Sequence, residues 1–215
     1  MYHQRVDDVT AFVLAGGKST RMGRDKALLK LGEETLLERA WKLARSITGE
    51  VRLAGDFPSA GRYDPVVRDI YPERGPLGGI HAALLETTTE LNLVIAVDIP
   101  FIERQFLDFL ITVARRDLAV VTVPRTGGFL HPLCAIYRRE FALASEKALL
   151  RGQNKIDVLF ENIQTRVIEE EEMLQRQFST EMFRNINTPE DWEKARLWAM
   201  ENEENVKKHP ENEPR

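Results

Sequence analysis

Short apolar runs alternate with longer amphipathic stretches along this chain, and that alternation leaves few folds open to it. The expected strands are Val9–Ala15, Val51–Ala54, Val66–Arg68, Leu93–Val97, Ala119–Val123 and Leu133–Tyr137. Several of these runs are almost wholly apolar, which is typical of strands covered on both faces in a parallel sheet. The expected helices are Leu36–Ile47, Leu77–Thr89, Arg104–Arg115, Phe141–Leu150 and Glu190–Met200. This order predicts an α/β fold with a doubly wound, mostly parallel sheet flanked by helices.

Local signals support the helix boundaries and the domain count. Thr35 with Glu38 fits a capping box, and the run 188–191 (TPED) places a cap, a proline and early acids in helical order. There is no internal repeat and no Gly/Ser/Pro linker in the middle, so residues 1–200 are expected to form one domain. More than half of Glu201–Arg215 is charged, which predicts a disordered tail. The acidic run Glu169–Glu172 is expected to be a solvated strand end or loop.

Composition excludes several classes of protein. The chain has 215 residues, with 30 Lys and Arg against 34 Asp and Glu, and a net charge of −4 argues against a nucleic-acid binder. Cys134 is the single cysteine, so an internal disulfide or a cysteine-rich metal site is excluded. No apolar run approaches 18 residues and the start is unlike a signal peptide, so we expect a cytoplasmic protein without membrane contact.

The most informative segment spans residues 14–26 (LAGGKSTRMGRDK) and follows directly on the first expected strand. Glycines let backbone N–H groups converge on an anion, and Arg21 and Lys26 add positive charge beside them. The segment fits neither a Walker A loop nor G-x-G-x-x-G. On the residues alone, either a phosphate-binding loop or a simple tight turn is consistent with it.

The string LAGGKSTRMGRDKALL closely resembles the opening signature of nucleotidyltransferases, and in particular of the molybdenum cofactor guanylyltransferase family. Later blocks at residues 75–80 (GPLGGI), 97–101 (VDIPF), 131–133 (HPL) and 185–190 (NINTPE) resemble that family's blocks in the same order. The resemblance implies a Rossmann-like nucleotidyltransferase fold and the transfer of GMP. In the implied reaction, the terminal phosphate of molybdopterin or of the molybdenum cofactor attacks the α-phosphate of GTP, pyrophosphate leaves, and a guanine dinucleotide cofactor forms.

Asp98 is the foremost catalytic candidate. It stands just past the carboxyl end of an expected strand, where a carboxylate can hold Mg²⁺ or merely cap a turn. The resemblance implies that Asp98 is the metal ligand. It also implies that Lys26 and Arg21 contact the phosphates, Lys26 as a point charge and Arg21 as a fork.

The resemblance divides the remaining candidates between two substrates. On the GTP side it implies Leu14, Ala15, Gly16, Gly17 and Asp69, together with Lys26 and Asp98. On the pterin side it implies Gly78, His131, Asn185 and Asn187. Many related sugar nucleotidyltransferases carry a second metal-binding Asp where this chain has the amides of Asn185 and Asn187. We therefore expect one protein carboxylate on the metal. Ala54 departs from the family, which often has a nucleotide-contacting Asn there.

Other functions remain to be weighed. A cytidylyl- or sugar-phosphate transferase on the same fold is the nearest alternative, although cytidylyl relatives carry Leu-Ala-Ala-Gly where this chain has Leu14-Ala15-Gly16-Gly17. A non-catalytic nucleotide-binding regulator is more remote, because Asp98, Lys26 and Arg21 are all present. The implied partners are GTP, the pterin acceptor and proteins that deliver or receive the cofactor, with Mg²⁺ as the cofactor.

Overall fold

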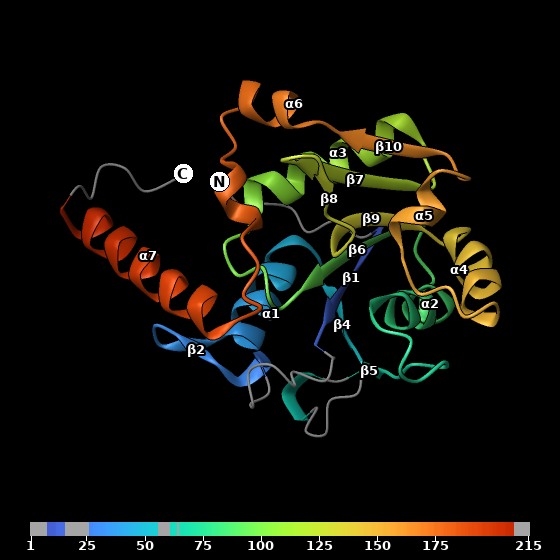
Figure 1. Ribbon diagram of the computed structural model, residues 1–215, viewed down its shortest axis with the longest axis horizontal. Helices are drawn as coiled ribbons and strands as arrows, with labels where there is room; N and C mark the ends of the chain where they lie inside the picture. The colour runs from blue at the N-terminus through green and yellow to red at the C-terminus, as the bar shows by residue number, and fades with distance from the viewer. Residues whose placement is uncertain (1–7, 16–25, 56–60, 64, 209–215) are drawn as a thin grey trace.

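A mixed eight-stranded sheet forms the centre of the computed structural model, which describes residues 8–15, 26–55, 61–63 and 65–208 (Figure 1). The strand order is β10-β7-β9-β6-β1-β4-β5, and β8 pairs with β7 alone. These strands are β1 (Val9–Leu14), β4 (Glu50–Ala54), β5 (Val66–Val67), β6 (Leu91–Ala96), β7 (Val121–Thr126), β8 (Phe129–Leu130), β9 (Cys134–Arg138) and β10 (Thr165–Ile168). A separate small hairpin joins β2 (Lys30–Leu31) to β3 (Glu34–Thr35).

Most neighbouring strands run in the same direction, as predicted. β1 is parallel to both β4 and β6, with Val13 opposite Leu53 and Ile95. β5 is parallel to β4, and β10 to β7. β9 is antiparallel to both β6 and β7, so these two strands run parallel to each other on either side of it. The carboxyl ends of β1, β4, β6 and β7 therefore meet at one edge of the sheet, where ligands bind in folds of this kind.

Helices cover both faces of the sheet. α1 (Leu36–Ile47) and α3 (Arg104–Asp117) pack on one face, and α2 (Pro76–Glu86) and α4 (Phe141–Leu150) on the other (Figure 1). The remaining helices are α5 (Asp157–Phe160), α6 (Glu170–Gln175), α7 (Pro189–Lys208) and the 3₁₀ turns η1 (Lys26–Leu28), η2 (Gly61–Tyr63) and η3 (Thr180–Phe183). Every residue of β1 and β6 is buried, which explains their continuous apolar runs.

Two predicted helix starts are confirmed in atomic detail. The Thr35 hydroxyl accepts from the Glu38 N–H while Glu38 accepts from the Thr35 N–H, which is a complete capping box for α1. The same reciprocal arrangement joins Thr188 and Asp191 at the start of α7. Each pair satisfies backbone donors that a helix start would otherwise leave without partners.

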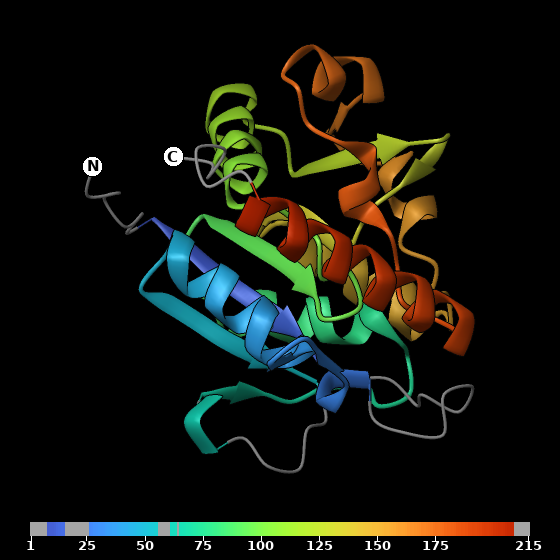
Figure 2. The same cartoon turned by 90° about the vertical axis from the view of Figure 1, so that its left-hand side faces the viewer.

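The structure differs from the sequence-based expectation at the C-terminal third. Residues 201–208 continue α7, so the prediction of disorder is wrong there; residues 209–215 lie outside the described chain. The acidic run at 169–172 begins helix α6 rather than a loop, and its Glu172 pairs with Arg166. α7 is anchored by Trp198, whose ring lies 4.3 Å from that of Phe101, and it crosses in front of the sheet in Figure 2.

None of the helices in the described chain is both long and apolar enough to cross a membrane.

Candidate functional site

Three segments distant in sequence meet around Asp98 at the carboxyl edge of the sheet. The Val97 N–H donates to the carbonyl of Leu14 at the end of β1, at 3.2 Å. The Asp98 carbonyl accepts from the N–H of Ile186 at 2.8 Å, which draws the segment before α7 over the end of β6. The backbone therefore fixes the flanks of Asp98 on both sides.

Lys26 joins two other predicted site residues. Its Nζ donates a 2.8 Å hydrogen bond to Asn187 Oδ1 and lies 3.9 Å from Asp98 Oδ2. The side chains of Lys26 and Asp98 are only 18% and 23% exposed. One cation, one carboxylate and one amide therefore lie together. The cation and the carboxylate are mostly buried, and the amide of Asn187 is exposed to solvent.

The Asp98 carboxylate is held in an electrostatically unfavourable place. Burial raises its pKa above the usual value, and the nearby Lys26 ammonium offsets only part of that rise. Its Oδ1 atom is buried and has no hydrogen-bond partner within the described part of the chain. A hard cation would satisfy this oxygen, because Mg²⁺ takes one or two carboxylates and completes its shell with phosphate oxygens and water. The described residues include no cluster of three or more acidic, His or Cys side chains that could hold a metal.

Asp69 lies against the start of α2. A Cβ at Gly78 would stand 3.1 Å from the carbonyl oxygen of Tyr71 and 3.4 Å from Asp69 Oδ2. A Cβ at Gly79 would stand 3.5 Å from Asp69 Oδ1 and 3.4 Å from Leu14 Cδ2. The structure therefore groups Gly78 with Asp69, a residue assigned from sequence to the GTP side, rather than with His131.

The backbone at the end of β1 is partly engaged within the sheet. The Leu14 carbonyl accepts from Val97, and the Ala15 N–H donates to the carbonyl of Ala54 at 3.1 Å. Ala54 thus contributes its backbone where the family often offers an Asn side chain. The predicted residues Gly16, Gly17 and Arg21 lie outside the described residues.

His131 sits on a neighbouring part of the same edge. Its Nε2 lies 2.6 Å from Thr126 Oγ1, and its ring stacks on Phe183 at 4.2 Å between centroids. Burial lowers its pKa, which favours the neutral imidazole. Leu133 carries this segment to β6, because its carbonyl accepts from the Ala96 N–H at 2.9 Å.

One residue of the site, Asp191, was not expected from sequence. Its carboxylate accepts from the N–H groups of Asn187 and Thr188 at 3.0 and 2.9 Å. Asp191 thereby positions the backbone of Asn187. The TPED run predicted the helix cap, but only the fold reveals that the cap also positions a site residue. The predicted residue Asn185 is exposed.

Comparison with known proteins shows which family the chain belongs to. The MobA-like NTP transferase domain matches residues 11–167. A protein of Carboxydothermus hydrogenoformans named probable molybdenum cofactor guanylyltransferase is 34% identical over 190 residues, covering 88% of this chain and 95% of the relative. The molybdenum cofactor guanylyltransferase of Syntrophotalea carbinolica is 31% identical, covering 87% and 90%. These matches confirm the resemblance read from the motifs.

Solved structures agree on the fold. Molybdopterin-guanine dinucleotide biosynthesis protein A from Archaeoglobus fulgidus superposes with a TM-score of 0.79 at 25% identity, covering 89% of this chain and 99% of that one. The 2-C-methyl-D-erythritol 4-phosphate cytidylyltransferase of Thermus thermophilus reaches a TM-score of 0.64 at 18% identity, with 88% and 98% covered. The second likeness is one of fold alone. The predicted α/β nucleotidyltransferase fold is confirmed.

Proposed function

Because the chain belongs to the family of MobA-like NTP transferase domains, we propose that it transfers GMP from GTP to the terminal phosphate of molybdopterin or of the molybdenum cofactor. An oxygen of the acceptor phosphate forms a bond to the α-phosphorus of GTP. The bond from that phosphorus to the oxygen bridging the α- and β-phosphates breaks, and its electrons leave with pyrophosphate. The names of the relatives quoted above support the guanylyl reading over the cytidylyl one.

The observation that carries the proposal is the meeting of Lys26, Asp98 and Asn187 at the carboxyl edge. Transfer between two phosphates requires anions to be held together and their charge to be balanced. Lys26 offers that charge beside Asp98 and Asn187. The amide of Asn187 adds hydrogen-bonding capacity without adding a negative charge that would repel phosphate.

Asp98 fits a Mg²⁺ ion as its one protein carboxylate, since its Oδ1 is buried and has no hydrogen-bond partner within the described residues. When bound, the ion would neutralise charge that develops on the phosphates. The chain itself contributes the position of the carboxylate, which the hydrogen bonds from Val97 to Leu14 and from Ile186 to Asp98 keep in place.

Incubation of the purified chain with GTP, MgCl₂ and molybdenum cofactor tests the proposal. We expect stoichiometric pyrophosphate and guanine dinucleotide cofactor, identified by mass spectrometry. A thermal-shift panel of GTP, ATP, CTP and UTP with Mg²⁺ gives an independent readout, because binding raises the apparent stability. A larger shift with CTP than with GTP, together with a cytosine product, would overturn the assignment to the guanylyl branch.

A further inference from the structure

A small cavity lies between α1 and the segment that follows Asp98. Its volume is about 180 Å³, and it is lined by Glu34 and Arg39 together with six apolar residues, which are Ala40, Leu43, Ile95, Ile99, Pro100 and Ile102. An apolar cavity of about 150 Å³ in another protein takes up benzene. The cavity beside α1 therefore has room for a ligand with a body the size of one ring.

The cavity is separate from the candidate active site. Its helical wall, α1, covers the face of the sheet opposite to α2, where Gly79 lies against Asp69 (Figure 1). Neither Lys26 nor Asp98 lines the cavity, although Ile99 directly follows Asp98 in the chain. A ligand in the cavity therefore leaves the residues of the candidate site accessible.

The walls of the cavity are fixed by contacts outside it. The Leu36 N–H donates to the carbonyl of Leu29 at 2.9 Å, and the capping box at Thr35 holds the first turn of α1. On the opposite wall, the ring of Phe101 packs against that of Trp198 on α7. Preformed cavities are typical of small-molecule sites, because little conformational freedom is lost when the ligand binds.

Arg39 brings a positive charge to the cavity that the surrounding protein leaves unpaired. Its Nε atom is buried without a hydrogen-bond partner in the described chain, and its guanidinium pairs with no acidic side chain there. Glu34 lines the same cavity, but its carboxylate pairs with Lys42 instead. A buried N–H donor without a partner costs free energy, which the oxygen of a bound anion would recover.

The lining selects a ligand with one carboxylate and an apolar body. The planar guanidinium of Arg39 matches a carboxylate, to which it can donate two parallel hydrogen bonds. The apolar residues around it disfavour a polar or multiply charged body, because buried polar groups without partners are costly. A nucleotide or a pyrophosphate is therefore a poor fit, and an aromatic or branched aliphatic monocarboxylate is a good one.

We propose that this cavity binds a small aromatic or branched aliphatic monocarboxylate, whose carboxylate lies on Arg39. The apolar body of the ligand then packs between α1 and residues 99–102. The site takes no part in the transfer of GMP, so it is independent of the proposed function.

Benzoate is the probe, and its uncharged analogue benzamide is the matched control ligand. We expect benzoate to bind the full chain with a Kd of about 1 mM, an ordinary ligand efficiency for about nine heavy atoms. At 10 mM it should raise Tm by about 3–6 °C. Benzamide lacks the charge and inorganic phosphate lacks the apolar body, so each should bind at least about tenfold more weakly than benzoate.

Variants of α1 locate the binding. Arg39→Met keeps an apolar stem but removes the charge, and it should raise the benzoate Kd at least about tenfold without lowering the Tm of the free protein. Arg45→Met removes an exposed arginine from the last turn of α1, outside the cavity, and should keep the wild-type Kd. Ala40→Leu places a larger side chain in the cavity and should also weaken benzoate binding.

Titration of benzoate in saturating GTP and Mg²⁺ tests whether the site is separate. We expect the Kd to stay within about twofold of its value without nucleotide, because separate sites need not compete. Competitive displacement of benzoate by GTP would place it in the candidate active site and overturn the inference. Equal affinity of wild type and Arg39→Met for benzoate, or the lack of binding at 10 mM, would also overturn it.

Discussion

Lys26 and Asn187 stand 161 positions apart in the chain, yet Lys26 Nζ donates a hydrogen bond of 2.8 Å to Asn187 Oδ1. The lysine belongs to the turn that follows the glycine-rich segment, and the asparagine immediately precedes the cap of α7. A single ammonium group therefore links the segment assigned to GTP with the segment assigned to the acceptor. Any ligand phosphate that approaches Lys26 competes with, or adds to, its contacts with Asn187 and Asp98.

Lys26→Ala should weaken GTP binding about 10- to 100-fold, the range for losing a hydrogen bond to a charged group. Guanosine binding should change little, because only the triphosphate presents the charge that Lys26 meets. Isothermal titration of both ligands measures the difference. Lys30→Ala, which removes an exposed lysine on β2, is the control. Equal losses for GTP and guanosine would place Lys26 away from the phosphates.

Asp98→Asn should separate activity from stability. Loss of the carboxylate should lower kcat by at least about 10²-fold, as removal of one electrostatic stabiliser does. Burial raises the pKa of Asp98, so its ionised form destabilises the folded protein at every pH above that pKa. The neutral amide removes this penalty, so Tm in EDTA at pH 7.5 should rise.

The control for Asp98→Asn is Asp108→Asn on α3, whose carboxylate pairs with Arg104 on the surface. That variant should keep its turnover and should not gain stability. Near-normal turnover of Asp98→Asn at saturating Mg²⁺ would show that Asp98 is not the metal ligand.

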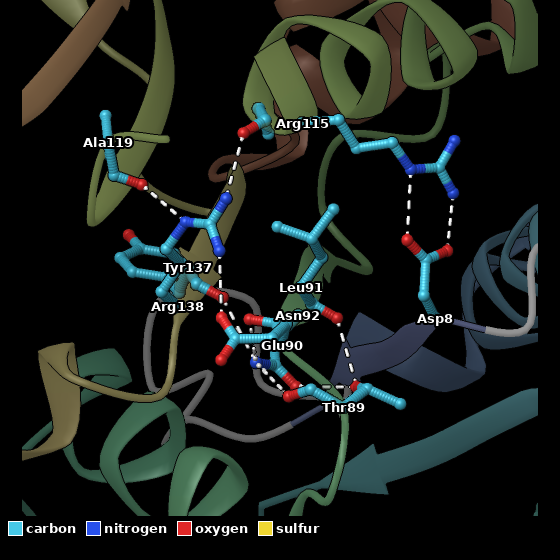
Figure 3. Close-up of polar contacts among 10 residues, drawn as sticks. Asp8, Thr89, Glu90, Leu91, Asn92, Arg115, Ala119, Tyr137 and Arg138 are labelled. Carbon is cyan, nitrogen blue, oxygen red and sulfur yellow. Dashed lines mark hydrogen bonds and ion pairs between the residues drawn. The ribbon is translucent and has the colours of Figure 1, made fainter. Parts of the chain in front are cut away.

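Arg138 ends β9 opposite Leu91, the first residue of β6, and so lies at the end of the sheet away from Asp98. Figure 3 shows the side chains around it. It donates to the carbonyls of Ala114 and Ala119 at 3.2 and 3.1 Å, and to Glu90 at 2.8 Å. Arg138→Ala leaves these carbonyls without that donor and should cost about 2–4 kcal/mol. The Tm should fall by about 4–16 °C, measured by calorimetry. Arg139→Ala removes its exposed neighbour and should leave Tm within about 1 °C, a surface substitution of small effect. Equal effects of the two variants would contradict this role.

The elements of the fold followed from local patterns, and their arrangement only in part. The continuous apolar runs of β1 and β6 predicted strands of a parallel sheet. The prediction succeeded because every residue of both strands is buried. The run at 133–137 was predicted as a strand without a direction, and β9 is antiparallel to its neighbours, because strand direction is set by pairing between distant segments. The charged residues after Met200 suggested disorder, but Glu and Lys are good helix formers and α7 continues through them.

The site was less accessible to sequence than the fold. Spacing placed Asp98 after a strand, but the family resemblance was needed to connect it with Lys26 and Asn187. Their contact depends on long-range packing that no local periodicity encodes.

His81 should make stability dependent on pH. It is 1% exposed on α2, and burial lowers its pKa below the ordinary 6.5, although Glu146 acts in the opposite direction. The unfolded chain therefore binds a proton that the folded chain resists, so stability falls as pH drops below about 6.5. His131 has a pKa shifted in the same direction.

The variant His81→Phe isolates the contribution of this residue. It keeps a ring beside Tyr71, which lies 5.4 Å away, and it cannot be protonated. We expect its Tm to fall less than that of wild type between pH 7.5 and 5.5, with the remaining fall assigned in part to His131. Parallel curves for the two proteins would show that His81 is protonated equally in the folded and unfolded chains.

Gly78 and Gly79 are adjacent in the first turns of α2 but should respond oppositely to alanine. Alanine in a helix is favoured over glycine by about 0.8–1.0 kcal/mol. At Gly79 the nearest atoms to a new Cβ are side-chain atoms of Leu14 and Asp69 at 3.4 and 3.5 Å, which is ordinary contact. Gly79→Ala should therefore keep or raise Tm, by up to about 4 °C. At Gly78 the Cβ would lie 3.1 Å from a backbone oxygen of Tyr71, which must shift together with the Asp69 segment. Gly78→Ala should lower Tm and raise the KM for GTP, because Asp69 is displaced. Calorimetry and GTP kinetics on the two variants decide the matter, and equal behaviour would show that α2 moves freely relative to Asp69.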